Sequence, residues 1–204
     1  SARNEVSSVS DATRGVISMA NPSAGNAMEY ITMASSGDSV DFGDRYSDNQ
    51  VGSGGVQSPT RGVFISGYGA SPYVVNNIMD YLTFSTLGNT ADFGDALTAV
   101  RYPAAASNAI RGVQCQGGAP NSHVNTIEFI TIATLGNAQD FGDLTMADLG
   151  FGSGACSSPT RAVFSNQTEV HLDYVQIMTT GNSVDFGDKT DNDSGGGGAS
   201  NGHG

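Results

Sequence analysis

The chain of 204 residues carries a formal net charge of −12 at pH 7, from 20 acidic and 8 basic residues. This balance argues against nucleic-acid binding, because contacts to phosphates require clustered lysine and arginine side chains. No stretch approaches the ~20 apolar residues of a membrane-spanning helix, so no membrane contact is predicted. The 28 glycines and the absence of tryptophan indicate a turn-rich chain without long helices.

Four short strands are predicted at the start of the chain, each bounded by turn residues. The first two cover residues 4–10 and 13–19, and a turn cluster at 21–26 separates them from a third strand at 28–35. The third strand is rich in Ile, Tyr, Met and Thr and is largely apolar on both faces, as in a strand buried on both sides. A Gly-Asp reversal then leads into a fourth strand, which ends at 41–44.

The same pattern recurs three more times, and the tetrapeptide Asp-Phe-Gly-Asp marks each copy. The copies lie at 41–44, 92–95, 140–143 and 185–188, with spacings of 51, 48 and 45 residues. Each copy follows an Arg-Gly-Val or Arg-Ala-Val string, a pair formed by an acid and an aromatic residue, and a Gly-Asn or Gly-Asp turn. A period of this size is typical of propeller blades and solenoid repeats.

The predicted fold is therefore all-β, a β-propeller-like repeat protein of four units of about 48 residues, each with four short antiparallel strands. One repeat domain covers 1–188, with units at about 4–46, 50–97, 103–146 and 153–188. Each unit cannot bury its apolar face alone, so contacts between units must stabilise the array.

The segments between the repeats are rich in small residues and predict flexible connections. They cover 51–58, 102–109 and 150–158, and a short strand is predicted within the last of them, at 154–157. The Gly-rich tail at 189–204 is predicted to be a linker. The alternative is that the tail opens a further repeat, because Ala199-Ser200-Asn201 aligns with Ala106-Ser107-Asn108.

At the level of the fold, the pattern is similar to Kelch-type propeller repeats, with a glycine-containing strand at Gln116-Gly117-Gly118. The chain lacks the Kelch tryptophan, and the Phe of the tetrapeptide would take its place. The strings at 60–64, 127–134 and 136–145 resemble repeats of virion structural and tail-fibre-like proteins of tailed bacteriophages, especially marine ones. The resemblance covers about 13–188 and implies a virion component, without any catalytic residue that could be carried over.

The charged residues that recur in every repeat are predicted to be architectural. They are expected to form an ion pair within each repeat and to lock one blade to the next, so that removing one partner would be costly. These residues are Arg14, Arg61, Arg111, Arg161, Asp41, Asp44, Asp92, Asp95, Asp140, Asp143, Asp185 and Asp188, together with the acid before each repeated aromatic, Glu29, Asp80, Glu128 and Asp173. The alternative is that aspartates of successive blades ring a central channel and share a Ca²⁺ ion, which requires six to eight oxygen ligands. We expect no cofactor.

Other candidate chemistry is not supported by the sequence. His123, His171 and His203 are not spaced as zinc ligands, and the first two are expected in exposed turns. The Asp-Phe-Gly string of protein kinases occurs once, beside a phosphate loop and a catalytic loop that this chain lacks. Cys115 and Cys156 are too few for a disulfide framework and are expected to be free thiols. The prediction is a protein that is not an enzyme.

One aromatic residue per unit could serve either structure or binding. These residues are Tyr30, Tyr81, Phe129 and Tyr174. Their identical place in all four units favours a role in the core between blades, and the alternative is a shallow sugar-binding groove.

The predicted function is a structural component of a phage virion, a tail or head fibre or a surface decoration protein, with other virion proteins or copies of itself as partners. The alternative is an adhesin that binds host-surface glycans through turns that differ between units, at 21–26, 67–77, 117–125 and 166–169. A second alternative is a self-assembling extracellular filament. The expected location is the virion, or for the alternatives the cell surface or the medium; no signal peptide is visible.

Overall fold

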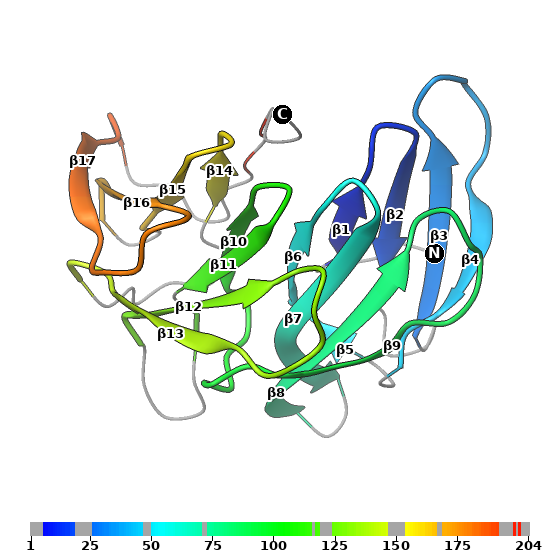
Figure 1. Ribbon diagram of the computed structural model, residues 1–204, viewed down its shortest axis with the longest axis horizontal. Coiled ribbons are helices and arrows are strands. Elements are labelled where there is room, and N and C mark those ends of the chain that lie inside the picture. Colours follow the sequence, from blue (N-terminus) through cyan, green and yellow to red (C-terminus); the bar gives the residue numbers. More distant parts are fainter. Residues whose placement is uncertain are drawn as a thin grey trace.

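The computed structural model describes residues 6–18, 26–46, 50–70, 73–115, 117–118, 124–146, 154–166, 169–191, 198 and 200. Within these ranges the chain is all-β and forms four antiparallel sheets that fan out like propeller blades without closing into a ring (Figure 1). The predicted all-β, propeller-like repeat is confirmed. In the same ranges, no helix has the length and apolar character needed to cross a membrane.

Each blade is an antiparallel sheet whose strands follow in sequence order, apart from an extra pairing in blade 2. Blade 1 contains β1 (Ser7–Ser10), β2 (Arg14–Ser18), β3 (Ala27–Thr32) and β4 (Val40–Asp44). Blade 2 contains β5 (Gln50–Val51), β6 (Gly54–Gln57), β7 (Arg61–Ala70), β8 (Tyr73–Thr83) and β9 (Ala91–Asp95). Blade 3 contains β10 (Ala104–Ser107), β11 (Arg111–Cys115), β12 (Thr126–Thr131) and β13 (Gln139–Asp143). Blade 4 contains β14 (Ala155–Ser157), β15 (Arg161–Ser165), β16 (His171–Gln176) and β17 (Val184–Asp188).

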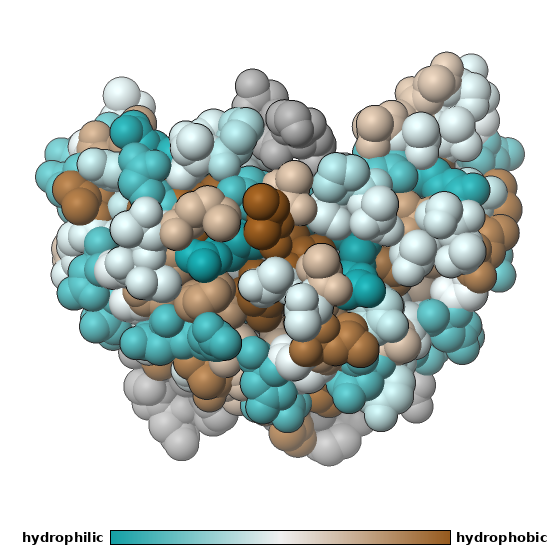
Figure 2. Space-filling model, in the orientation of Figure 1, coloured by the Kyte–Doolittle hydropathy of each residue, from teal (hydrophilic) through white to brown (hydrophobic). Residues whose placement is uncertain are grey.

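The innermost strands are β1, β6, β10 and β14, and those of neighbouring blades contact one another. The strands that carry the tetrapeptides, β4, β9, β13 and β17, form the outer edge of the fan, with blades 1 and 4 at its two ends (Figure 1). The face of the fan shown in Figure 2 is mixed, with apolar side chains among hydrophilic ones.

Two segments predicted to be flexible connections are instead innermost strands. β6 lies within 51–58 and β10 within 102–109. Their small residues reflect close packing at the centre of the fan, because a Cβ atom added to Gly55 would lie 2.5 Å from the carbonyl oxygen of Ser8. The variable turn predicted at 67–77 is also wrong for its described residues, since β7 and β8 continue through it as a long hairpin. The turns predicted at 21–26, 117–125 and 166–169 lie largely outside the described residues.

The tetrapeptide forms a β-bulge in every blade. In blade 1, Met28 pairs with Gly43 and Glu29 pairs with Asp41, so Phe42 is the extra residue of β4. The same shift leaves Phe93, Phe141 and Phe186 as the extra residues of the other blades. A bulge redirects a side chain relative to the regular alternation of a strand, and in blades 1 to 3 it places the phenylalanine against the next blade.

Three apolar clusters fill the spaces between the blades. In the first, Val16, Met28 and Phe42 of blade 1 pack with Phe64, Leu82 and Phe84 of blade 2. The second and third clusters join blade 2 to blade 3 and blade 3 to blade 4 with equivalent residues. We call the side of a blade that carries the bulged phenylalanine its trailing face, and the opposite side its leading face. Each cluster therefore joins one trailing face to one leading face.

Candidate functional site: the joint between blades

The contacts between one trailing face and the next leading face recur at all three junctions, and we call each set a joint. At the first joint, the backbone N–H of Gly88 donates to the carbonyl oxygen of Phe42 (2.8 Å), and Thr90 N–H donates to Asp44 (2.9 Å). The Asn89 side chain accepts a hydrogen bond from the Asp44 backbone N–H at 3.0 Å. The turn of one blade is thus hydrogen-bonded to the bulge of the blade before it.

The other two joints repeat these bonds. At the second joint, Gly136 donates to Phe93, Ala138 donates to Asp95, and Asn137 accepts from Asp95. At the third joint, Gly181 donates to Phe141, Ser183 donates to Asp143, and Asn182 accepts from Asp143. The asparagine after each turn glycine therefore belongs to the joint. Sequence reasoning assigned it only to a tight turn, although its recurrence in three units was a visible signal.

The bulge glycine is required by close backbone contact as well as by its own conformation. Gly142 has φ +145°, and a Cβ atom there would lie 2.5 Å from the carbonyl carbon and oxygen of Gly181 in the next blade. Gly187, its equivalent in blade 4, has φ +129° but no neighbour within 4 Å of such a Cβ. The two positions share the strained φ, and only Gly142 adds a backbone clash.

Gly142→Ala is therefore expected to destabilise the chain by about 1–3 kcal/mol more than Gly187→Ala, because only the first substitution overpacks a joint. Urea denaturation of both variants measures the difference in the free energy of unfolding, and Gly187→Ala is the matched control for the cost of φ. Equal losses would show that backbone contact at the joint is not what demands glycine.

The predicted ion pair between the repeat arginine and a repeat aspartate is wrong for the described residues, which form no such pair. Each arginine stacks on the aromatic residue of its own blade, as Arg111 does on Phe129 with 4.1 Å from guanidinium to ring centroid. In blades 1 to 3 this guanidinium also donates to a backbone carbonyl of the next blade, at 3.0 Å from Arg111 to Ile177. Arg61 donates to Ile132 at 2.9 Å, and Arg14 donates to Phe84. An arginine that stacks and donates N–H groups satisfies a carbonyl that a carboxylate pair would leave unbonded.

The repeated aromatics take part in the same arrangement. Tyr30, Tyr81, Phe129 and Tyr174 each meet the bulged phenylalanine of their own blade edge to face, with ring centroids about 6 Å apart. Tyr30 and Tyr81 pack against the first and second clusters and Phe129 belongs to the third, and each of the four rings also carries the arginine of its own blade.

The aspartates of the tetrapeptides lie at the surface and do not ring the axis. Seven are exposed and Asp44 is half-buried, and all eight are on the outermost strand of their blade. The hypothesis of a Ca²⁺ ion shared in a central channel is wrong, because the strands that meet at the centre are those without the tetrapeptide. Among the described residues, no group of three or more His, Cys, Asp and Glu side chains could hold a metal ion.

Three of the four acids that precede the repeated aromatics are buried, namely Asp80, Glu128 and Asp173. Asp80 is fully buried and pairs with Arg45 of blade 1, at 2.5 Å from the guanidinium to Oδ1 and 3.0 Å from Nε to Oδ2. Thr90 also donates to Asp80, at 2.6 Å. Arg45 follows the tetrapeptide of blade 1, so this ion pair crosses the first joint. Arg45 was not among the predicted site residues, because it has no basic counterpart in blades 2 and 3.

At the second joint the equivalent acid has no cationic partner among the described residues. Glu128 is buried and accepts hydrogen bonds from Leu97 N–H (2.5 Å) and from the Gln114 side-chain amide (2.8 Å). Burial raises the pKa of the Glu128 carboxyl above its ordinary value of 4.5, and the hydrogen bonds oppose this rise. The folded state therefore retains the Glu128 proton to higher pH than the unfolded chain does.

The stability that this proton contributes is fully present below pH 4.5 and is lost as pH rises through the raised pKa. Glu128→Gln removes the titration. As pH rises, the free energy of unfolding of the variant should increase relative to that of the parent. The expected increase is about 1.4 kcal/mol for each unit by which folding raises the pKa of Glu128. Urea denaturation across this range measures it. A difference that does not depend on pH would contradict the buried-acid assignment.

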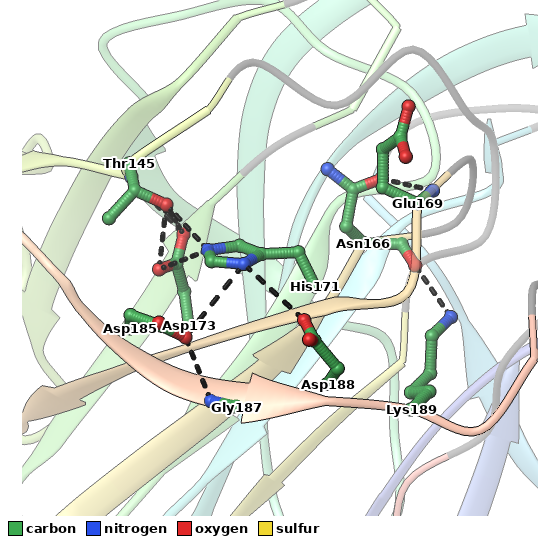
Figure 3. Close-up of polar contacts among 9 residues, drawn as sticks. All are labelled: Thr145, Asn166, Glu169, His171, Asp173, Asp185, Gly187, Asp188 and Lys189. Atoms are coloured by element: carbon green, nitrogen blue, oxygen red, sulfur yellow. Dashed lines mark hydrogen bonds and ion pairs between the residues drawn. The ribbon is translucent and has the colours of Figure 1, made fainter.

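At the third joint, Asp173 accepts hydrogen bonds from the backbone N–H of Thr145 (3.1 Å) and from its hydroxyl (2.9 Å). His171 lies 2.8 Å from the same hydroxyl through Nε2, and its Nδ1 lies 3.8 Å from Asp185. Figure 3 shows the imidazole between the Thr145–Asp173 pair and the carboxylates of Asp185 and Asp188. His171 is the half-buried first residue of β16, so the prediction of an exposed turn is wrong there. His123 and His203 lie outside the described residues.

Comparison with known proteins supports the architecture. The chain shares the fold of a solved structure named "Structure of YjhT", with a TM-score of 0.74 and 7% sequence identity. The match covers 94% of this chain and 67% of that one. At this identity the likeness concerns the fold alone. No protein-family model and no curated protein match the sequence.

Proposed function

We propose that the protein is a structural component of a phage virion, a β-repeat scaffold that presents its turns outward. The observation that carries this proposal is the use of the recurring residues. Arginine, asparagine, glycine and bulged phenylalanine all serve the joints, so the repeat encodes a rigid framework. The resemblance of the repeats to virion and tail-fibre-like proteins supports the same function.

The acidic surface suits this role. Most of the repeat carboxylates are exposed along the outer edge of the fan, where they keep the scaffold soluble before assembly. The proposed partners are other virion proteins or copies of the chain, and the proposed location is the virion.

Immunogold labelling tests the proposal. Antibodies against the purified chain are applied to particles purified from cultures that carry the gene, with particles from a strain without the gene as control. Gold at a tail, a head fibre or the capsid surface is the expected result. Full recovery of the chain in the particle-free fraction would contradict the proposal.

A glycan-binding adhesin is the second candidate, favoured by one feature of blade 2. The hairpin of β7 and β8 runs past β6 and β9, with the short strand β5 paired to it at Tyr68 and Gly69, and Val74 near its tip is 57% exposed. Close to this tip, the hydroxyls of Tyr68 and Tyr102 lie 2.9 Å apart. A glycan-array signal that Tyr73→Ala removes would support the adhesin, and a silent array would contradict it.

A further inference from the structure

The trailing face of blade 4 lacks the cover that the other three trailing faces have. Phe186 is 50% exposed, whereas Phe42, Phe93 and Phe141 are each 2% exposed. On the innermost strand, Cys156 is exposed where its equivalents Val9, Val56 and Ala106 are buried. The trailing face of blade 4 therefore exposes Phe186 and Cys156 to solvent.

The leading face of blade 1 also exposes residues that are buried in the other blades. Ile31 is 38% and Met33 is 59% exposed. Their equivalents in the other blades are at most 4% exposed, namely Leu82, Ile130 and Val175 for the first, and Phe84, Ile132 and Ile177 for the second. The two ends of the fan are thus the two halves of one joint.

The hydrogen-bonding groups of a joint are also divided between the two open faces, with the acceptors on blade 4 and the turn residues on blade 1. No described residue donates to the carbonyl of Phe186 as Gly88 donates to that of Phe42. On blade 1, Gly37 and Ser39 occupy the positions of the two donors, and Asp38 occupies the position of the accepting asparagine. Arg161 stacks on Tyr174, as its equivalents stack on theirs, but its guanidinium reaches no carbonyl of a following blade in the described part of the chain.

Both open faces border the same hollow. A cavity of about 460 Å³ is lined by the innermost strands of all four blades, by Ile31 and Met33 of blade 1, and by Cys156 of blade 4. Gly198 and Ser200 lie at its edge. Gly198 lies against β14 much as Gly55 lies against β1, because an added Cβ would meet the carbonyl of Ala155. Residue 198 of this chain thus lies beside β14, where the innermost strand of a following blade would lie.

The size of the gap follows from the fold comparison. Four units correspond to 67% of the chain in "Structure of YjhT", so a fold of that length has room for about two more blades. A second copy of this chain would bring four blades, more than the gap holds.

We propose that the ring is completed by a polypeptide with two further blades of this repeat. Its first blade covers Phe186 and Cys156 with an aliphatic leading face and a Gly-Asn turn. Its last blade places a bulged phenylalanine on Ile31 and Met33. This inference goes beyond the proposed function, since it concerns closure of the ring whatever particle the protein belongs to.

The probe is the full chain extended at its C-terminus by a second copy of residues 50–146, which contains blades 2 and 3. Blade 2 has the leading face that fits blade 4, and blade 3 has the trailing face that fits blade 1. The readout is the maleimide labelling rate of Cys156, located by peptide mass, with buried Cys115 as internal reference.

We expect Cys156 to be labelled at least about tenfold more slowly in the extended chain than in the 204-residue chain, because labelling then requires the new joint to open. The matched control is the extended chain with Phe186→Asp, which should regain the parent rate. Since Phe186 is half-exposed in the parent, this variant should fold, and circular dichroism verifies it.

Two outcomes would overturn the proposal. One is equal labelling of Cys156 with and without the extension in folded protein. The other is slower labelling of the unextended chain at rising concentration together with a doubled mass, because the occupant would then be a second copy.

Discussion

Phe141→Ala is expected to lower the free energy of unfolding by about 3–5 kcal/mol, whereas Phe186→Ala should cost less than about 1 kcal/mol. Both residues are the bulged phenylalanine of the same tetrapeptide. Phe141 is 2% exposed and packs in the third cluster with Phe164 and Ile177, whereas Phe186 is 50% exposed. Only at Phe141 does truncation leave a cavity between two blades.

Urea denaturation followed by circular dichroism measures both losses. Phe186→Ala is the matched control, since it changes the same residue type in the same bulge without removing a joint. Comparable losses would show that the phenylalanine stabilises its own blade, through the edge-to-face contact with the neighbouring aromatic, and not the joint. In the extended chain described above, Phe186→Ala should become nearly as costly as Phe141→Ala.

Asp80→Asn is also expected to cost about 3–5 kcal/mol, because it leaves the buried guanidinium of Arg45 without its counter-charge. Both side chains are almost fully buried, and their bonds cross the first joint. Arg45 also lies over the ring of Phe64, 4.7 Å from its centroid, so it cannot move into solvent without disturbing that cluster.

Glu29→Gln is the control for the loss of an acid at this position. Glu29 occupies the equivalent place in blade 1, is only half-buried and, among the described residues, accepts a side-chain hydrogen bond only from Ser39. Glu29→Gln should therefore change the free energy of unfolding by no more than about 0.5 kcal/mol. Adding Arg45→Leu to Asp80→Asn should recover part of the lost stability, because the unpaired charge is gone. Failure of the double variant to recover any stability would mean that packing, and not charge, dominates at this site.

The sequence by itself determined the all-β class, the number of units and most of the strands. These features depend on local patterns: apolar alternation, turn glycines and a string that recurs about every 48 residues. The recurrence of arginine, acid, aromatic and tetrapeptide also marked the residues from which the joints are built.

Tertiary structure alone decided what those residues contact. The guanidinium of Arg111 bonds a carbonyl 66 residues away, and the pair of Arg45 with Asp80 spans 35 residues. Spacing within a unit could not reveal such partners, and an ion pair inside each repeat was the wrong inference. Phe186 shows the limit most clearly, because it has the same local sequence as Phe141 and the opposite exposure. Burial at a joint is a property of the neighbouring blade, and a repeat pattern does not say which blade has a neighbour.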